Sequence, residues 1–511
     1  MAMTQRDSGI LLHPTCLPGP FGIGELGSEA IRFADWLHRH GQSVWQVLPL
    51  GPTGYGDSPY QTLSAFAGNP NLISLADLAQ QGWLPWEELK AAPRFDAGRV
   101  DFATVIPWRT QMLQYAFLGF QTHADSGTLA EFSDWCNEER EWLADYALFR
   151  SLKMRFGGAS WLAWPKEFSL RDPAPLSQAR TESAAEIQQI CFEQWVFHRQ
   201  WSALRSECQA RGIRLIGDIP IFVAHDSSDV WSNREQFALQ ADGQPAVVAG
   251  VPPDYFSATG QRWGNPLYRW EVMKEDGYRW WIQRLKATFA LFDEVRIDHF
   301  RGFESYWEIP ASEPTAVVGR WRQGPAADFF QHIQAELGEL PIIAEDLGVI
   351  TAEVEALRDQ FSFPGMKVLQ FAWSDPANPF LPHNYSENCI AYVGTHDNNT
   401  TLGWWQHEMQ EDGRQFAKDY LREAIHEPHW AMIHCGMRSV ARTFMATMQD
   451  LLALGSEARM NTPGQEQGNW SWRMPEDYDR LPCGELLQQV TWLTRRLPEQ
   501  QQAAYGDAAQ G

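Results

Sequence analysis

The chain has 511 residues, a formal net charge of −23 and a hydrophobic fraction of 44%, and it contains 25 tryptophans. Binding of nucleic acid or of an anionic membrane needs a basic surface, so this charge argues against both partners and suits a neutral substrate better. Tryptophan rings are also flat platforms on which sugar rings stack, although we expect most of these tryptophans to be structural.

The cysteines and the N-terminus indicate the cellular compartment in which the protein is expected. The seven cysteines are scattered along the chain and show no CxxC spacing, which is typical of reduced thiols in a cytoplasmic protein. The N-terminus has no apolar segment of the kind that a signal peptide requires, and no later run of about 18 apolar residues is uninterrupted. We therefore expect a soluble, cytoplasmic protein.

The first elements predicted along the chain form a β-α-β unit. Residues 8–14 (SGILLHP) are predicted to form a strand, Ser28 to cap a helix that ends at Gly41, and residues 43–52 (SVWQVLPLGP) to form the next strand. This order is typical of a parallel sheet with helices packed outside it.

A long insertion is predicted after the second strand, over residues 53–185. It begins with a loop rich in Gly, Pro, Ser and Asn, in which Tyr55 and Tyr60 could either stack on a ligand or pack the loop onto the fold. From residue 75 onward the pattern is mostly helical and rich in tryptophan. The insertion is therefore predicted to be largely helical.

The third strand is predicted at 213–223 (IRLIGDIPIFV), followed by a loop insertion over residues 222–270. Asp218 lies inside the strand, where an ionised carboxylate needs a partner, so it is either a substrate contact or a structural acceptor. Residues 249–268 follow an irregular path with several prolines and glycines, and such loops are usually lids or binding loops. Its candidate ligand contacts are Asp254, Tyr255, Phe256, Gln261, Trp263 and Asn265.

Five further strands complete the predicted sheet. Most are separated by helical segments, although the step from the third to the fourth lacks a clear helix. The predicted ranges are 292–300, 341–348, 366–373, 390–397 and 458–464. Eight strands with mostly helical crossovers predict a single α/β domain over residues 1–511, a (β/α)8 TIM barrel with helical and loop insertions.

The strand at 292–300 brings charged side chains to its C-terminal end. Alternation along a strand places Arg296 and Asp298 on the same side, and His299 follows them. If that side is a pocket, the guanidinium keeps Asp298 ionised, as a carboxylate nucleophile requires. The alternative interpretation is a buried Arg–Asp pair with a structural role.

Two other predicted strands also end in an acid. Glu345 follows the apolar run of LPIIAEDLG, and Asp397 follows that of AYVGTHDNN. Active sites of (β/α)8 barrels lie at the C-terminal ends of the strands, where Asp298 is also expected. Three carboxylates there fit glycosidic-bond chemistry, in which one acts as nucleophile, one as acid/base and one supports an electron-deficient sugar.

Several long strings resemble one known family, the amylomaltases or 4-α-glucanotransferases of glycoside hydrolase family 77. The similarity extends from Gly9 to near Arg473, and its strings are GPTGYGDSPYQ, GDIPIFVAHDSSDVW, GVPPDYFSATGQRWGNPLY, VRIDHFRGF, IIAEDLG, GTHDNNTT and MNTPGQEQGNW. The resemblance implies the compact form of the family, which is similar to the α-amylase clan but has no C-terminal β-domain. It also implies no organic cofactor and no catalytic metal, and no HExxH, EF-hand or phosphate-loop motif argues otherwise.

The resemblance also implies roles for individual residues. Asp298 is expected to be the nucleophile, Glu345 the general acid/base and Asp397 the transition-state stabiliser. The residues expected to contact the substrate are Ser58, Tyr60, Asp254, Tyr255, Phe256, Gln261, Trp263, Arg296, His299, His396 and Asn469, and Asp218 is included with them as a candidate.

The predicted function is that of a 4-α-glucanotransferase. Such a hexosyltransferase moves a segment of α-1,4-glucan to the 4-hydroxyl of glucose or of a maltooligosaccharide, by a retaining reaction through a covalent glucosyl–aspartate intermediate. Its expected partners are α-1,4-glucans and maltooligosaccharides. One alternative is an α-amylase-like retaining hydrolase. Another is a non-catalytic glucan-binding barrel, which the presence of all three acids disfavours.

Overall fold

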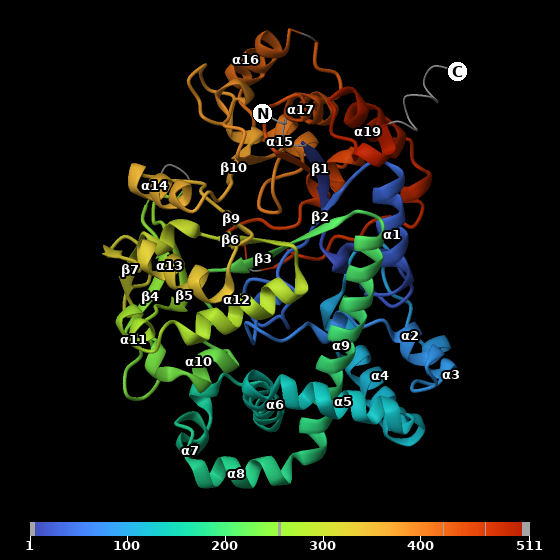
Figure 1. Ribbon diagram of the computed structural model, residues 1–511, viewed down its shortest axis with the longest axis vertical. Coiled ribbons are helices and arrows are strands. Elements are labelled where there is room, and N and C mark those ends of the chain that lie inside the picture. The colour runs from blue at the N-terminus through green and yellow to red at the C-terminus, as the bar shows by residue number, and fades with distance from the viewer. Residues whose placement is uncertain (1–5, 254–256, 423, 466, 503–511) are drawn as a thin grey trace.

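The computed structural model describes residues 6–253, 257–422, 424–465 and 467–502 (Figure 1). Its centre is a sheet of eight parallel strands, in the order β10-β11-β12-β1-β2-β3-β6-β9. The strands are β1 (Asp7–Leu11), β2 (Val44–Gln46), β3 (Arg214–Pro220), β6 (Glu294–Asp298), β9 (Ile342–Ala344), β10 (Gly365–Val368), β11 (Cys389–Tyr392) and β12 (Thr443–Thr447). The predicted α/β class and the (β/α)8 barrel are confirmed.

The two outer strands of this sheet meet and nearly close the barrel. The backbone N–H of Ala344, at the end of β9, donates to the carbonyl of Pro364, just before β10, at 3.0 Å. Side chains from most of the strands fill the interior, namely Val44, Ile216, Ile343, Met366, Val368, Ile390, Tyr392 and Met445. Because these side chains fill the barrel, the polar residues at the C-terminal ends of the strands lie at its rim, where the active sites of such barrels are found.

Helices connect most of the barrel strands. They are α1 (Ser28–Arg39), α9 (Ala184–Ala210), α12 (Arg279–Leu291), α13 (Ala326–Leu337), α14 (Ala352–Gln360), α15 (Thr401–His407), α16 (Glu411–Leu421) and α17 (Pro428–Met437). The step from β10 to β11, which is described in full, contains only two 3₁₀ turns, at Leu369–Phe371 and Pro382–Asn384. After β12 come α18 (Met448–Leu451) and α19 (Cys483–Leu493).

The predicted eighth strand at 458–464 is wrong, because that position in the barrel is taken by β12. All five residues of β12 are buried, so the strand has no alternation, and it lies in a region whose sequence is otherwise helical. Residues 458–464 instead follow a 3₁₀ turn, Ser456–Ala458. Their backbone then runs beside the loop after β11, where Asn461 N–H donates to the carbonyl of His396 at 3.1 Å.

The stretch between β2 and β3 contains the helices that Figure 1 shows gathered in its lower part, away from α15, α16, α17 and α19 at the top. They are α2 (Leu75–Gln80), α3 (Trp86–Lys90), α4 (Phe102–His123), α5 (Ser126–Glu138), α6 (Arg140–Arg155), α7 (Lys166–Ser169) and α8 (Pro173–Glu182). Aromatic rings join them to α9, where Trp195 lies 5.4 Å from Phe120 and 5.8 Å from Trp83. Many tryptophans therefore serve packing.

The range 222–270, predicted as loops, also contains regular structure. It includes α10 (Ser228–Ser232), β4 (Val247–Val251) and β5 (Gln261–Pro266). Together with β7 (Ser305–Pro310) and β8 (Arg320–Gln323), strands β4 and β5 form an antiparallel sheet in the order β5-β4-β7-β8. α11 (Trp270–Glu275) follows β5. Within the part of the chain described here, no helix is long and apolar enough to cross a membrane.

Candidate active site

Asp298 is the last residue of β6, and Arg296 lies two positions before it on the same side of the strand. Nη2 of Arg296 donates to Oδ1 of Asp298 at 2.8 Å. The Arg296 side chain is 5% exposed and that of Asp298 is 34% exposed, so the guanidinium contacts the carboxylate from within the protein and leaves it accessible. A charge-assisted bond of this kind stabilises a negative charge on Asp298.

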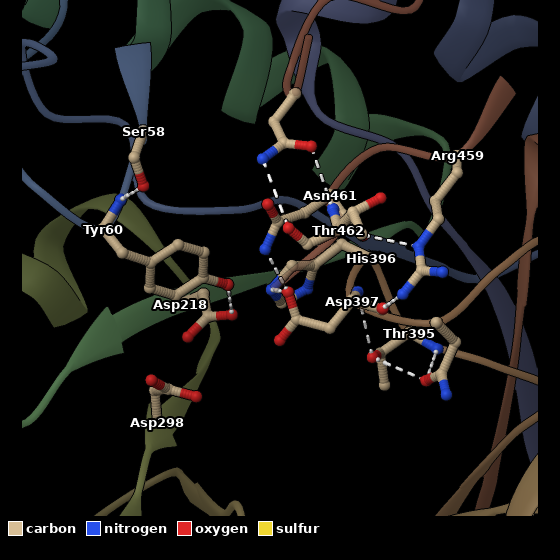
Figure 2. A network of polar contacts seen from close by, with 12 residues as sticks. Ser58, Tyr60, Asp218, Asp298, Thr395, His396, Asp397, Arg459, Asn461 and Thr462 are labelled. Carbon is tan, nitrogen blue, oxygen red and sulfur yellow. Dashed lines mark hydrogen bonds and ion pairs between the residues drawn. The ribbon is translucent and has the colours of Figure 1, made fainter. Parts of the chain in front are cut away.

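Asp218, on the adjacent strand β3, holds the same guanidinium. Nη1 of Arg296 donates to its two carboxylate oxygens at 2.9 and 2.8 Å. The phenol of Tyr60 donates to Oδ2 of Asp218 at 2.8 Å (Figure 2). Burial raises the pKa of Asp218 to about 7, and the positive charge of Arg296 opposes the shift. Of the two predicted interpretations of Asp218, these contacts favour the structural acceptor.

Glu345 directly follows β9; its backbone N–H donates to the carbonyl of Ile297 in β6, and its C=O accepts from the N–H of Phe300, two residues after β6, both at 3.2 Å. Each carboxylate oxygen accepts one backbone N–H, from His299 at 2.8 Å and from Leu347 at 2.9 Å. Burial, and next the negative charge of Asp298, raise the pKa of Glu345 to about 8. The carboxyl is therefore mostly protonated at neutral pH.

Asp397 reaches the site from the loop after β11. This strand is the neighbour of β10, whereas Asp298 and Glu345 come from β6 and β9 at the opposite end of the strand order. Nδ2 of Asn461 donates to its Oδ1 at 2.6 Å, and Nε2 of His396 lies 3.3 Å from the same oxygen. The side chain is 46% exposed. Figure 2 shows Asp218, Asp298 and Asp397 on three separate segments of backbone.

Aromatic and imidazole rings surround these acids. The Tyr60 ring stacks on that of His396, with centroids 5.1 Å apart, and Trp470 lies 5.9 Å from both rings. Trp263 meets the ring of His299 edge-on at 4.8 Å. Burial lowers the pKa of both histidines, that of His299 to about 3, so both rings are neutral at physiological pH. His299 has a φ of 56°, an uncommon left-handed conformation that turns the chain directly after β6.

The site therefore combines an accessible carboxylate beside a guanidinium with a neighbouring carboxyl whose pKa is raised. An accessible carboxylate beside a cation, next to a buried carboxyl that holds its proton, is the combination that a nucleophile and a general acid require. Among the described residues, no group of three or more His, Cys, Asp or Glu side chains is placed to hold a metal ion.

Comparison with known proteins identifies the family. The family model for 4-alpha-glucanotransferase, glycoside hydrolase family 77, matches residues 12–479. The chain belongs to this family. It is 54% identical to a 4-alpha-glucanotransferase of Thermus thermophilus over 502 residues, which cover 96% of this chain and 99% of that protein. It is 51% identical to one of Synechocystis over 480 residues, covering 93% and 95%.

The structure of a family 77 amylomaltase is also similar. The amylomaltase of Streptococcus agalactiae in complex with acarbose superposes with a TM-score of 0.94, at 38% identity, over 97% of this chain and 100% of that one. The amylomaltase of Corynebacterium glutamicum shares the fold, with a TM-score of 0.79 at 16% identity. The amylomaltase resemblance of the sequence is confirmed.

Of the other predicted substrate contacts, Ser58, Gln261 and Asn469 form hydrogen bonds with residues at this site or next to it. Oγ of Ser58 accepts from the backbone N–H of Tyr60 at 3.2 Å, and Oε1 of the exposed Gln261 accepts from Nε1 of Trp263 at 3.1 Å. Asn469 bonds backbone groups of its own loop at 2.9 and 2.8 Å. Asn265 is buried. The predictions for Asp254, Tyr255 and Phe256 concern residues outside the described part of the chain.

Sequence reasoning missed two residues that hold Asp397 in this family 77 site, Arg459 and Asn461. Asn461 bonds the carboxylate, and Nη2 of Arg459 donates to the backbone carbonyl of Asp397 at 2.6 Å. Asn461 belongs to the string MNTPGQEQGNW, whose similarity to the family was a signal that could have drawn attention to it. That string was interpreted in part as a barrel strand, which left the side chain without a role.

Proposed function

We propose that this protein is a 4-α-glucanotransferase that transfers segments of α-1,4-glucan to the 4-hydroxyl of glucose or of a maltooligosaccharide. The observation that carries the proposal is the pairing of Asp298 with Glu345. The two acids lie at the ends of adjacent strands, where Arg296 stabilises a negative charge on the first and burial raises the pKa of the second to about 8. Membership of the family supports the same reaction.

In the first step, a carboxylate oxygen of Asp298 attacks the anomeric carbon of the donor while Glu345 protonates the departing glycosidic oxygen. The glycosidic bond breaks, and a glucosyl–aspartate ester forms with the shortened sugar as leaving group. In the second step, Glu345, now a carboxylate, removes the proton from the acceptor 4-hydroxyl, and that oxygen attacks the anomeric carbon, which breaks its bond to Asp298 and releases the free carboxylate. Two inversions retain the α-configuration.

The third acid and the neutral rings support the sugar between these steps. We assign Asp397 to stabilise the oxocarbenium-like transition state, because its carboxylate is accessible and belongs to the same site. His299 and His396 are neutral and thus suited to hydrogen bonds with uncharged hydroxyls. Arg296 uses Nε, Nη1 and Nη2 on protein partners, so we assign it to position Asp298.

The test is incubation with maltotriose, followed by sizing of the products and by measurement of reducing ends. Transfer gives longer oligomers and glucose at a constant number of reducing ends. Hydrolysis by an α-amylase-like enzyme adds one reducing end per event, and a non-catalytic barrel leaves maltotriose unchanged. Either of the last two outcomes contradicts the proposal.

We also place the reaction in the cytoplasm. The structure joins none of the seven cysteines in a disulfide, as is usual for proteins of reducing compartments. Fractionation of the source cells with detection of this chain tests the assignment, and recovery outside the cytoplasm contradicts it.

A further inference from the structure

The carboxylate of Asp397 has an asymmetric set of partners. Oδ1 accepts from Nδ2 of Asn461 at 2.6 Å and lies 3.3 Å from Nε2 of His396. Among the described residues no hydrogen bond reaches Oδ2, and the side chain is 46% exposed. One oxygen is therefore held by the protein while the other faces the accessible side of the site.

Asn461 is itself held by hydrogen bonds to neighbouring residues that Figure 2 labels. Its N–H donates to the carbonyl of His396 at 3.1 Å, and its own carbonyl accepts from Nε of Arg459 at 2.7 Å. The same guanidinium donates through Nη2 to the carbonyl of Asp397 at 2.6 Å and through Nη1 to Glu408 at 3.3 Å. Together with the bond from Nδ2 of Asn461 to Asp397, three hydrogen bonds thus join residues 459–461 to residues 396–397.

The next residue extends this connection to a predicted substrate contact. The N–H of Thr462 donates to Oδ1 of Asn469 at 2.9 Å. The segment that holds Asp397 is therefore the first part of the loop that carries Asn469.

We propose that Asn461 is a positioning residue that holds Oδ1 of Asp397, so that Oδ2 is presented to the sugar in the transition state. The proposal rests on the role assigned to Asp397 above. A primary amide nitrogen can only donate, so it keeps Asp397 an acceptor and adds no charge that would compete with Arg296. Asn461 does not touch the substrate in this assignment, and its effect on the reaction passes entirely through Asp397.

The main test is Asn461→Asp, which is close in size but replaces the donor by an ionisable group. The two carboxyl groups would lie about as far apart as the present 2.6 Å contact, and like charges at this distance cannot both ionise, so the pair holds one shared proton until the pH rises. While the two carboxyl groups share a proton, the protonated one donates to the other, as the amide does in the wild type. When that proton is lost at higher pH, the two negative charges repel each other and displace Asp397.

We therefore expect kcat for maltotriose to decline at rising pH in both proteins. The decline of Asn461→Asp should begin at a lower pH than the decline of the wild type. The matched control is Gln465→Glu, the same amide-to-carboxylate change at an exposed position of the same loop. It should keep the wild-type pH profile. A profile of Asn461→Asp that matches the wild type, or that shifts no more than that of Gln465→Glu, overturns the proposal.

A second variant, Asn461→Leu, keeps the approximate volume and removes the donor. Hydrogen bonds to charged groups are strong enough for a loss of about 10- to 100-fold in kcat, with a much smaller change in KM. A merely structural role would instead lower the thermal midpoint and leave kcat of the folded fraction near the wild-type value, which would overturn the proposal. The wild type in the same assay tests the proposed function separately, because that function is contradicted only when the wild type itself hydrolyses maltotriose or leaves it unchanged.

Discussion

Asp298 and Glu345 carry similar side chains but have different surroundings. Arg296 donates to Asp298, whereas Glu345 accepts only two backbone N–H groups and loses more from desolvation than it gains from them. The strand register explains the placement, because Ile297 pairs with Ala344 and the two acids follow at the same level. Two predictions concern these acids.

The first concerns the three acids as a unit. Asp298→Asn, Glu345→Gln and Asp397→Asn should each fold and lose nearly all turnover of maltotriose, because removal of a covalent nucleophile or acid/base costs about a thousandfold or more. The measurement is initial rates of glucose release, with circular dichroism as the control for folding. A variant that kept even a tenth of the wild-type rate would show that its acid has another role.

The second concerns pH. The carboxyl of Glu345 has its pKa raised to about 8, so it is protonated, as the first step requires, at every pH below that value. As the pH rises through about 8 the proton is lost, and kcat/KM should fall by about tenfold per pH unit. Initial rates across the neutral and alkaline range measure this limb. A decline that already begins at the ordinary pKa of a glutamate would contradict the assignment of Glu345.

At the scale of elements, the hairpin of β4 and β5 stands beside the barrel strands that carry the acids. Val251 pairs with Gln261 at the last step of the ladder, and Trp263 on β5 reaches the ring of His299. The two ends of the connection between β4 and β5 approach each other closely. Gly260 has a φ of 65°, and a Cβ there would lie 2.4 Å from the carbonyl oxygen of Val251. The hairpin therefore holds Val251 and Gln261, the two ends of this connection, near the active site.

We expect this connection to favour a sugar over water in the second step. Both acceptors use the same base, so transfer requires a bound and oriented sugar, and orientation can be worth an effective molarity of about 10⁵ M or more. Tyr255 and Phe256 lie outside the described residues, and we expect their aromatic rings to stack on the acceptor and to exclude solvent. The double substitution Tyr255→Ala with Phe256→Ala should raise the ratio of hydrolysis to transfer while cleavage continues at a reduced rate.

The measurement follows reducing ends and free glucose in parallel on maltooligosaccharides, because transfer conserves reducing ends and hydrolysis adds one per event. If the folded double variant keeps the wild-type ratio, acceptor selection must be assigned to the barrel rim instead.

At the scale of the whole molecule, a single buried guanidinium joins distant parts of the chain. Arg496 lies just after α19, is fully buried, and donates to five backbone carbonyls at distances from 2.7 to 3.3 Å. These belong to Asp7 in β1, to Met437 at the end of α17, and to Ser439, Ala441 and Arg442 before β12. Burial lowers the pKa of Arg496 to about 10, so the group remains charged at physiological pH.

Arg496→Met should therefore lower the free energy of unfolding by about 3 kcal/mol or more, because it leaves buried carbonyls without their donors. Urea titration followed by tryptophan fluorescence measures the change. The matched control is Arg495→Met at the adjacent exposed residue, which should change the free energy by no more than about 0.5 kcal/mol. Similar losses in the two variants would show that Arg496 has no special role in joining the chain ends.

The sequence alone predicted the barrel class, which the structure confirms, and three acids at strand ends, whose catalytic roles stay a prediction. Asp298, Glu345 and Asp397 could be predicted because each follows a short apolar run, and the edge at which parallel strands end is a local property of the pattern. The long strings shared with the family also determined the expected reaction. The eighth strand, Thr443–Thr447, was not recognised, because a strand buried on both faces lacks alternation and this one lies between helices.

Only the tertiary structure decided what surrounds each acid. Tyr60 and Asp218 are 158 positions apart in the chain, and Asp397 and Asn461 are 64 apart, yet each pair forms a direct hydrogen bond. The local sequence does not show that these residues are partners, since an amide or a phenol on an irregular loop has no periodicity. The protonation of Glu345 likewise depends on burial and on the charge of Asp298, which exist only once strands β6 and β9 are paired and the barrel has formed around them.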